Sequence, residues 1–108
     1  MGKINSKQKG ARAERDWAKT LRDAGFPARR GCQYAGGPDS PDVVCESLPF
    51  HWEVKHVEKL NIWNAIEQCN EDAGEGETPV VVFKKNHKNW QICIDAQDFL
   101  NIIKDKEN

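Results

Sequence analysis

A continuous apolar run at residues 79–83 (PVVVF) most limits what this chain can fold into. Runs of this kind are typical of strands buried in the centre of a sheet. Residues 50–55 (FHWEVK) follow a different pattern, in which apolar residues alternate with His51, Glu53 and Lys55. If this segment is a strand, its three polar side chains share one face. The sequence therefore predicts a sheet with one buried strand and one strand that carries a polar face.

Turn and cap residues divide the rest of the chain into helices and strands. Gly25 ends a first helix that begins near Ser6, and Asp95 caps a final short helix. Two closely spaced strands, at 42–46 and 50–56, are most simply an antiparallel hairpin. The order is α-β-β-β-α-β-β-α, which predicts the α/β class with an α+β mixed sheet flanked by helices. The helices are predicted over 6–24, 62–73 and the residues after 95, and the strands over 28–34, 42–46, 50–56, 79–83 and 90–94.

The chain length predicts one domain. A chain of 108 residues is long enough for a modest core but not for two, so we expect a single domain over residues 1–108. No segment approaches a membrane span, and the first residues lack the apolar run of a secretory signal. We therefore expect a soluble, intracellular, cytoplasmic protein. Its four cysteines are scattered without a C-x-x-C pair, which favours buried thiols over a zinc site.

The first helix carries an apolar stripe with an acidic residue beside it. Ala13, Trp17, Leu21 and Ala24 recur at helical spacing and predict the buried face. Glu14 lies one position from this stripe, which places it near the core rather than far out in solvent.

Basic residues are concentrated in the first part of the chain. Residues 1–30 hold nine Lys/Arg against three Asp/Glu, although the whole chain has a net charge of −1. This distribution would suit a surface that faces phosphates, and a solvated basic helix face explains it equally well. The best candidates for phosphate contacts are Lys7, Lys9, Arg12, Arg29 and Arg30.

Antiparallel pairing of the predicted hairpin would bring Asp42 beside Glu53 and Lys55. Hard cations such as Mg²⁺ bind carboxylate oxygens and keep several waters, so two carboxylates and a substrate phosphate make a plausible site. Taken singly, each residue also has a structural explanation. Glu53 and Lys55 could be a surface ion pair worth at most about 1 kcal/mol. Asp42, which follows a proline, could be a turn residue.

Several elements of the chain carry residues of one known pattern. The segment 9–15 (KGARAER) lies on the first helix and contains Glu14. The other matching residues are Arg30 on the first strand, Pro41-Asp42 with Glu53-Val54-Lys55 on the hairpin, and Gln68 on the next helix. Together they resemble the PD-(D/E)xK nuclease superfamily, and within it the archaeal-type Holliday junction resolvases. Taken alone, Gln68 is more simply a helix-surface residue.

The resemblance implies a restriction-endonuclease-like core and a Mg²⁺-dependent, structure-selective DNA endonuclease, a Holliday junction resolvase. A metal-activated water would leave 5′-phosphate ends, and Mn²⁺ is expected to substitute. The alternatives are a nuclease for nicks, flaps or damaged duplex, and a DNA-binding module that keeps the fold without cutting. The implied catalytic residues are Glu14, Asp42, Glu53, Lys55 and Gln68. The implied metal ligands are Asp42, Glu53, the backbone carbonyl of Val54, and Glu14.

The implied substrate, a branched four-way DNA junction, also predicts a homodimer. Resolving such a junction requires two symmetric cuts, which a two-fold dimer provides. Leu60, Ile62 and Trp63 are one candidate interface, although a core position is the simplest expectation for Trp63 itself. His51 and His56 are expected to face DNA or to lie behind the metal ligands.

Overall fold

The computed structural model describes residues 6–31 and 43–106, with the backbone alone described for residues 6–8. The predicted order of elements is confirmed. The elements are α1 (Ser6–Asp23), β1 (Ala28–Arg30), β2 (Val43–Cys45), β3 (Phe50–His56), α2 (Ile62–Asp72), β4 (Thr78–Lys84), β5 (Gln91–Ile94) and α3 (Ala96–Lys106).

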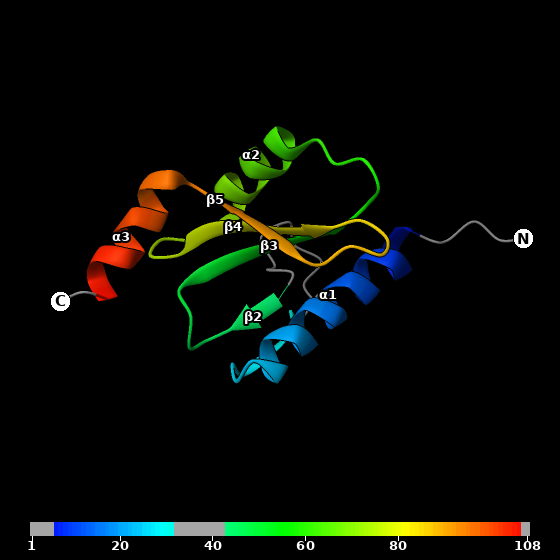
Figure 1. Cartoon of the computed structure of the whole chain (residues 1–108), viewed down its shortest axis with the longest axis horizontal. Helices are drawn as coiled ribbons and strands as arrows, with labels where there is room; N and C mark the ends of the chain where they lie inside the picture. Colours follow the sequence, from blue (N-terminus) through cyan, green and yellow to red (C-terminus); the bar gives the residue numbers. More distant parts are fainter. Residues whose placement is uncertain (1–5, 32–42, 107–108) are drawn as a thin grey trace, which may run out of the picture.

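The five strands form one mixed sheet in the order β1-β2-β3-β4-β5. The predicted hairpin is confirmed, because β2 and β3 are antiparallel with Val43 opposite Trp52. β3 and β4 are parallel, and α2 connects them. Figure 1 shows α1 on one side of the sheet and α2 on the other, so the central strands are covered on both faces.

Aromatic side chains fill the core between α1 and the sheet. The ring of Trp17 on α1 lies 5.4 Å from that of Trp52 on β3 and 5.7 Å from that of Trp90, in edge-to-face geometry. Such pairs add about 0.5–1.5 kcal/mol to the free energy of burying the rings. Ala13 and Leu21 are also buried, as predicted, and Ala18 joins them.

The prediction that Ala24 is buried was wrong, because α1 ends at Asp23. The N–H of Phe26 donates to the Leu21 carbonyl at 2.9 Å and that of Gly25 to the Arg22 carbonyl at 3.0 Å, which is a Schellman motif. Gly25 has a φ of +100°, which a residue without a side chain adopts readily. Ala24 is left exposed just beyond the end of the helix.

The second core lies between α2 and the other face of the sheet. Ala65 and Cys69 on α2 pack against Val81 on β4, and Val80, Val81 and Val82 are almost fully buried, as the apolar run predicts. The polar face of β3 lies on this side, opposite Trp52 and Val54. It is buried as well, with His51 at 3% and Glu53 at 7% exposure.

The prediction of a core position for Trp63 was wrong, since 71% of this side chain is exposed. Asn61 caps α2 by accepting a hydrogen bond from the Asn64 N–H at 3.1 Å, and this start of the helix turns Ala65 and Cys69 towards the sheet. Trp63 precedes Ala65 by two residues, or about 200° of helical rotation, and so faces away.

The last helix is less buried than the other two. Asp95 caps α3 as predicted, accepting from the Asp98 N–H at 3.0 Å, but α3 has no buried residue. The cysteines were predicted as buried thiols, and this holds for Cys45 and Cys69, whereas Cys93 is half-buried and Cys32 lies outside the described residues. None of the described helices is both long enough and apolar enough to cross a membrane.

Trp17→Ala should lower the free energy of unfolding by about 3–5 kcal/mol, because it empties the centre of the α1 core. Phe26→Ala removes an aromatic ring just beyond the same helix, where 38% of the residue is exposed, and should cost about 1 kcal/mol or less. Urea unfolding followed by far-ultraviolet circular dichroism would measure both. Equal losses would show that Trp17 is not central to the core.

Candidate active site

Glu53 and Lys55 lie on the same face of β3 and interact directly. The Lys55 ammonium is 3.2 Å from a Glu53 carboxylate oxygen. The carboxylate side is nearly buried, whereas 38% of the Lys55 side chain is exposed. A buried carboxylate is costly unless cations or hydrogen bonds compensate it. The pair therefore differs from a surface ion pair, because one partner lies inside the protein and the other reaches solvent.

Asp42 lies outside the described residues. It immediately precedes Val43, the first residue of β2, and Val43 is the register partner of Trp52. Trp52 is in turn next to Glu53 in the chain. The role of Asp42 as a metal ligand stays a prediction, as does that of the Val54 carbonyl.

Glu14 is buried on α1, at 8% exposure, and is bound by a residue of the first strand. The Arg30 Nε–H donates to its carboxylate at 2.8 Å. Both residues were singled out from the sequence, Glu14 for the metal and Arg30 for phosphate. The geometry joins them to each other, so the Arg30 charge is at least partly used in compensating a buried acid.

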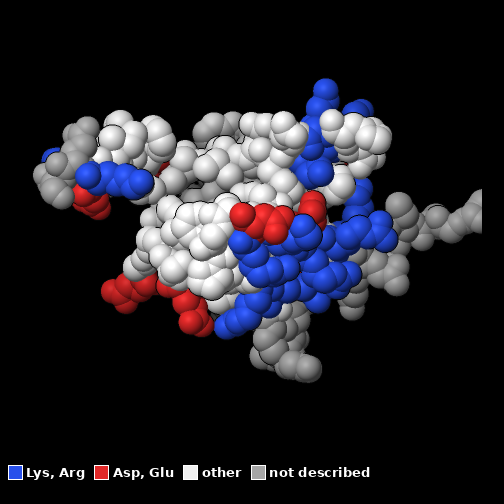
Figure 2. Space-filling view, turned by 60° about the horizontal axis from the view of Figure 1, so that its bottom comes forward, with Lys and Arg blue, Asp and Glu red and all other residues white. Residues whose placement is uncertain are grey.

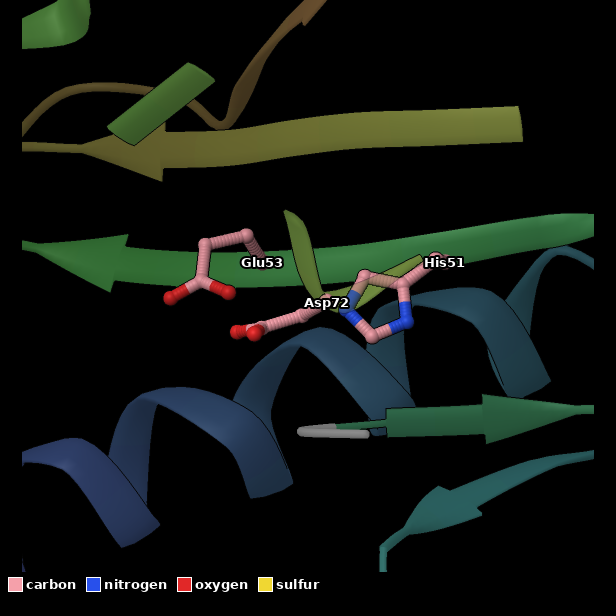
Figure 3. A group of neighbouring side chains, drawn as sticks. All are labelled: His51, Glu53 and Asp72. Carbon is pink, nitrogen blue, oxygen red and sulfur yellow. The ribbon is translucent and has the colours of Figure 1, made fainter. Parts of the chain in front are cut away.

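Gln68 is an exposed residue of α2 whose side chain contacts an acid one helical turn later. Its Nε2 donates to the Asp72 carboxylate at 3.0 Å. Asp72, Glu53 and His51 each offer a ligand atom, and these atoms lie within 4.8 Å of one another. Figure 3 shows the three side chains close together beside β3. Among the described residues this group includes Glu53 but not Glu14.

Asp72 was not predicted from the sequence, and His51 was not predicted as a ligand. The signal that could have found Asp72 is its spacing, since residues four apart on a helix are neighbours and Gln68 had already been placed near the site.

The donor types suit a divalent cation. Carboxylate oxygens bind Mg²⁺, Mn²⁺ and Ca²⁺, and an imidazole nitrogen adds affinity for transition metals. Glu53 is buried and Asp72 is half-buried, so both could bind a cation from the positions that they occupy in the structure. The residues of this part of the chain therefore fit a divalent cation.

The predicted phosphate-binding residues lie on and beside α1. Figure 2 shows Lys and Arg side chains gathered on the surface over this helix. Arg12 is exposed and Lys9 half-buried, whereas the side chain of Lys7 lies outside the described part. Arg29 is exposed and lies 3.3 Å from the Glu46 carboxylate.

Comparisons with known proteins agree with this arrangement. The family described as "Phage putative PDDEXK endonuclease" matches residues 5–108. The chain belongs to this family. A solved structure of Hjc, a Holliday junction resolvase from the archaeal hyperthermophile Archaeoglobus fulgidus, matches with a TM-score of 0.59 and 29% identity, over 77% of this chain and 73% of that chain. No curated protein is significantly similar in sequence.

The chain is thus a PD-(D/E)xK nuclease with the restriction-endonuclease-like fold of Hjc. Nucleases of this kind usually use divalent metals, and the group around Glu53 offers ligands for one. The resemblance recognised in the sequence is confirmed, and so are the fold class and the order of elements.

Arg30→Gln should destabilise the nuclease by about 2 kcal/mol, because it removes a close cationic partner of the buried Glu14 carboxylate. The figure is below that for a fully buried pair, since a third of the Arg30 side chain is exposed. Arg29→Gln changes the neighbouring residue of the same strand, which has an exposed partner, and should cost less than about 1 kcal/mol. Thermal and urea unfolding of the two variants would test this, and equal effects would contradict a structural role for the Arg30 pair.

Proposed function

We propose that the chain, as one domain over residues 1–108, is a divalent-cation-dependent endonuclease that cuts branched DNA. The observation that carries the proposal is the buried Glu53 carboxylate with the Lys55 ammonium 3.2 Å away, on one strand face of a PD-(D/E)xK nuclease. The similarity to Hjc, itself a Holliday junction resolvase, supports a four-way DNA junction as the substrate.

Asp42, Glu53 and the Val54 carbonyl would hold Mg²⁺, with Glu14 acting through a water or at a second ion. When bound, the cation would supply a water of lowered pKa and neutralise charge on the phosphate. Lys55 orients the attacking water and stabilises negative charge on the phosphate oxygens. Water adds to phosphorus as the bond to the 3′ oxygen breaks, which leaves 5′-phosphate and 3′-hydroxyl ends.

Side-chain contacts define the roles of two of the proposed catalytic residues, Glu14 and Gln68. Arg30 holds the Glu14 carboxylate at 2.8 Å, which fixes it on the inner side of α1. Gln68 donates to Asp72 at 3.0 Å and so orients an acid that lies beside Glu53. Gln68 is therefore a positioning residue in this proposal.

The basic surface over α1 would bind the DNA backbone. Arg12 is exposed there, and Lys9 and Lys7 precede it on the same helix. Because contacts of this kind release counterions from DNA, affinity should fall steeply with salt. Arg29 and Arg30 would contribute less than a free arginine, since each is already close to a carboxylate.

Glu53→Gln should lower cleavage of a synthetic four-way junction in Mg²⁺ by at least about 100-fold, since the ion loses a charged ligand. Asp42→Asn should act in the same way, and both variants should still bind the junction. Glu67→Gln, an exposed acid on α2, is the matched control and should cut normally. Lys55→Met should also lose cleavage, whereas Lys59→Met, which alters an exposed lysine of the following loop, should not.

The same cleavage assay with other DNA substrates distinguishes a junction nuclease from the alternative functions. The same sequences presented as linear duplex, nicked duplex and flaps should be cut more slowly than the junction. Equal cutting of linear duplex would contradict the proposed selectivity for branched DNA, but it would leave the proposed nuclease activity standing. Binding to junctions without any cleavage in Mg²⁺ or Mn²⁺ would leave only a DNA-binding module.

We further propose a homodimer, because two cuts on a four-way junction are made most simply by two related sites. Several large apolar side chains are exposed, among them Trp63, Phe99, Leu100 and Ile103. The candidate interface formed by Leu60, Ile62 and Trp63 includes the most exposed of these. Leu60 and Ile62 are half-buried beside it.

Light scattering at micromolar concentration should therefore give twice the chain mass of 12.3 kDa. Trp63→Ala should shift the mass towards one chain, because exposed aromatic residues often dominate the stability of an interface. Phe26→Ala, which alters an aromatic residue at the end of α1, should leave the dimer intact. A wild-type mass of one chain would overturn the dimer without affecting the cleavage proposal.

A further inference from the structure

His51 is a buried imidazole held near one carboxylate on one side and facing two others on the opposite side. Only 3% of the residue is exposed, and its ring makes no hydrogen bond within residues 6–31 and 43–106. Its Nδ1 lies 3.7 Å from the Glu77 carboxylate. In Figure 3 the ring nitrogen on the opposite side, Nε2, faces Asp72 and Glu53. Polar groups of buried residues usually have a hydrogen-bond partner or a bound water or ion.

The two acids that face this ring come from different elements. Glu53 lies two residues after His51 on β3, so both side chains point to the same face of the sheet. Asp72 comes from the last turn of α2, across that face. The three ligand atoms lie within 4.8 Å of one another. Ligands at about 2.0–2.2 Å from one ion are at most about 4.4 Å apart when they lie on opposite sides and closer otherwise, so the three side chains would move towards one another to hold an ion.

We propose that His51, Glu53 and Asp72 form a divalent-cation site that prefers transition metals such as Mn²⁺, Co²⁺ or Zn²⁺ over Mg²⁺. The site shares Glu53 with the proposed catalytic centre, but its existence does not require that the chain cleaves DNA. The imidazole sets the preference. Nitrogen ligands suit these metals, whereas Mg²⁺ takes oxygen ligands in near-octahedral geometry and retains its waters.

Outer contacts hold two of the three ligands in place. Glu77 lies against the Nδ1 side of His51, and its carboxylate is itself fixed by the Gly74 N–H at 2.7 Å. A carboxylate on the far nitrogen helps to orient a metal-binding imidazole. Gln68 does the same for Asp72 through its hydrogen bond of 3.0 Å. Gln68 and Glu77 are therefore positioning residues for this site.

The test is calorimetric titration of the full chain with Co²⁺, in the absence of DNA, together with the visible absorption of the bound ion. An Asp42→Asn background removes a ligand of the proposed catalytic ion, and it should still bind one Co²⁺ per chain. In that background Asp72→Asn and His51→Gln should each weaken binding at least about 10-fold. The His51 change should also shift the absorption, because a nitrogen ligand is lost. Glu71→Gln, an exposed neighbour of Asp72 on α2, is the matched control and should bind like its parent.

Two further measurements keep the outcome clear. Circular dichroism of each variant shows whether it is folded. If His51→Gln unfolds the chain, the test depends on Asp72→Asn, which alters a residue that is only half-buried. Mg²⁺ at the same concentration should fail to displace Co²⁺. Loss of Co²⁺ binding in the Asp42→Asn background, or equal affinity of Asp72→Asn and Glu71→Gln, would overturn the site. Failure of junction cleavage alone would count against the proposed nuclease activity and not against this site.

Discussion

The parallel pairing of β3 with β4 is the constraint on which the rest of the structure depends. Two parallel neighbours cannot be joined by a tight turn, so the chain must cross over the sheet between them. It does so with α2, which covers one face of both strands. The polar face of β3 is thereby enclosed instead of facing water. An ordinary alternating strand becomes a place where a glutamate and a histidine are buried and must be compensated.

The other face of the sheet has a different role. There α1 packs its tryptophan against Trp52 and Trp90, which makes a rigid apolar support behind β3. The same helix carries Glu14, one position after the buried Ala13, and β1 supplies Arg30 to hold it. α1 sets where β3 lies, and the enclosed face of β3 sets which charges gather there.

Much of this fold could be predicted from local patterns. The alternation at 50–56, the apolar run in β4 and the cap at Asp95 depend on near neighbours in sequence, and each gave an element with almost the observed bounds. The burial of His51 and Glu53 could not be predicted in the same way. It depends on the crossover helix α2 covering the second face of β3, and alternation alone does not show that both faces are covered.

The errors and omissions have similar causes. Trp63 is apolar, but the phase of α2 is set by its cap and by Ala65 and Cys69, so the tryptophan faces out. Asp72 carries no motif and becomes relevant only because the last turn of α2 returns to β3. For the candidate site, the sequence identified Glu53, Lys55 and their spacing, and the fold added His51 and Asp72. The part played by Asp42 rests on the sequence and the family.

The length of α2 determines the position of the Asp72 carboxylate relative to β3. Asn61 fixes its first turn and Asp72 stands on its last, so the eleven helical residues determine where that carboxylate arrives. A single residue inserted between them would rotate Asp72 by about 100° and raise it by about 1.5 Å, away from Glu53. In relatives of this chain the outer face of α2 should therefore vary freely in residue type, while the number of residues between the cap and the acid stays constant.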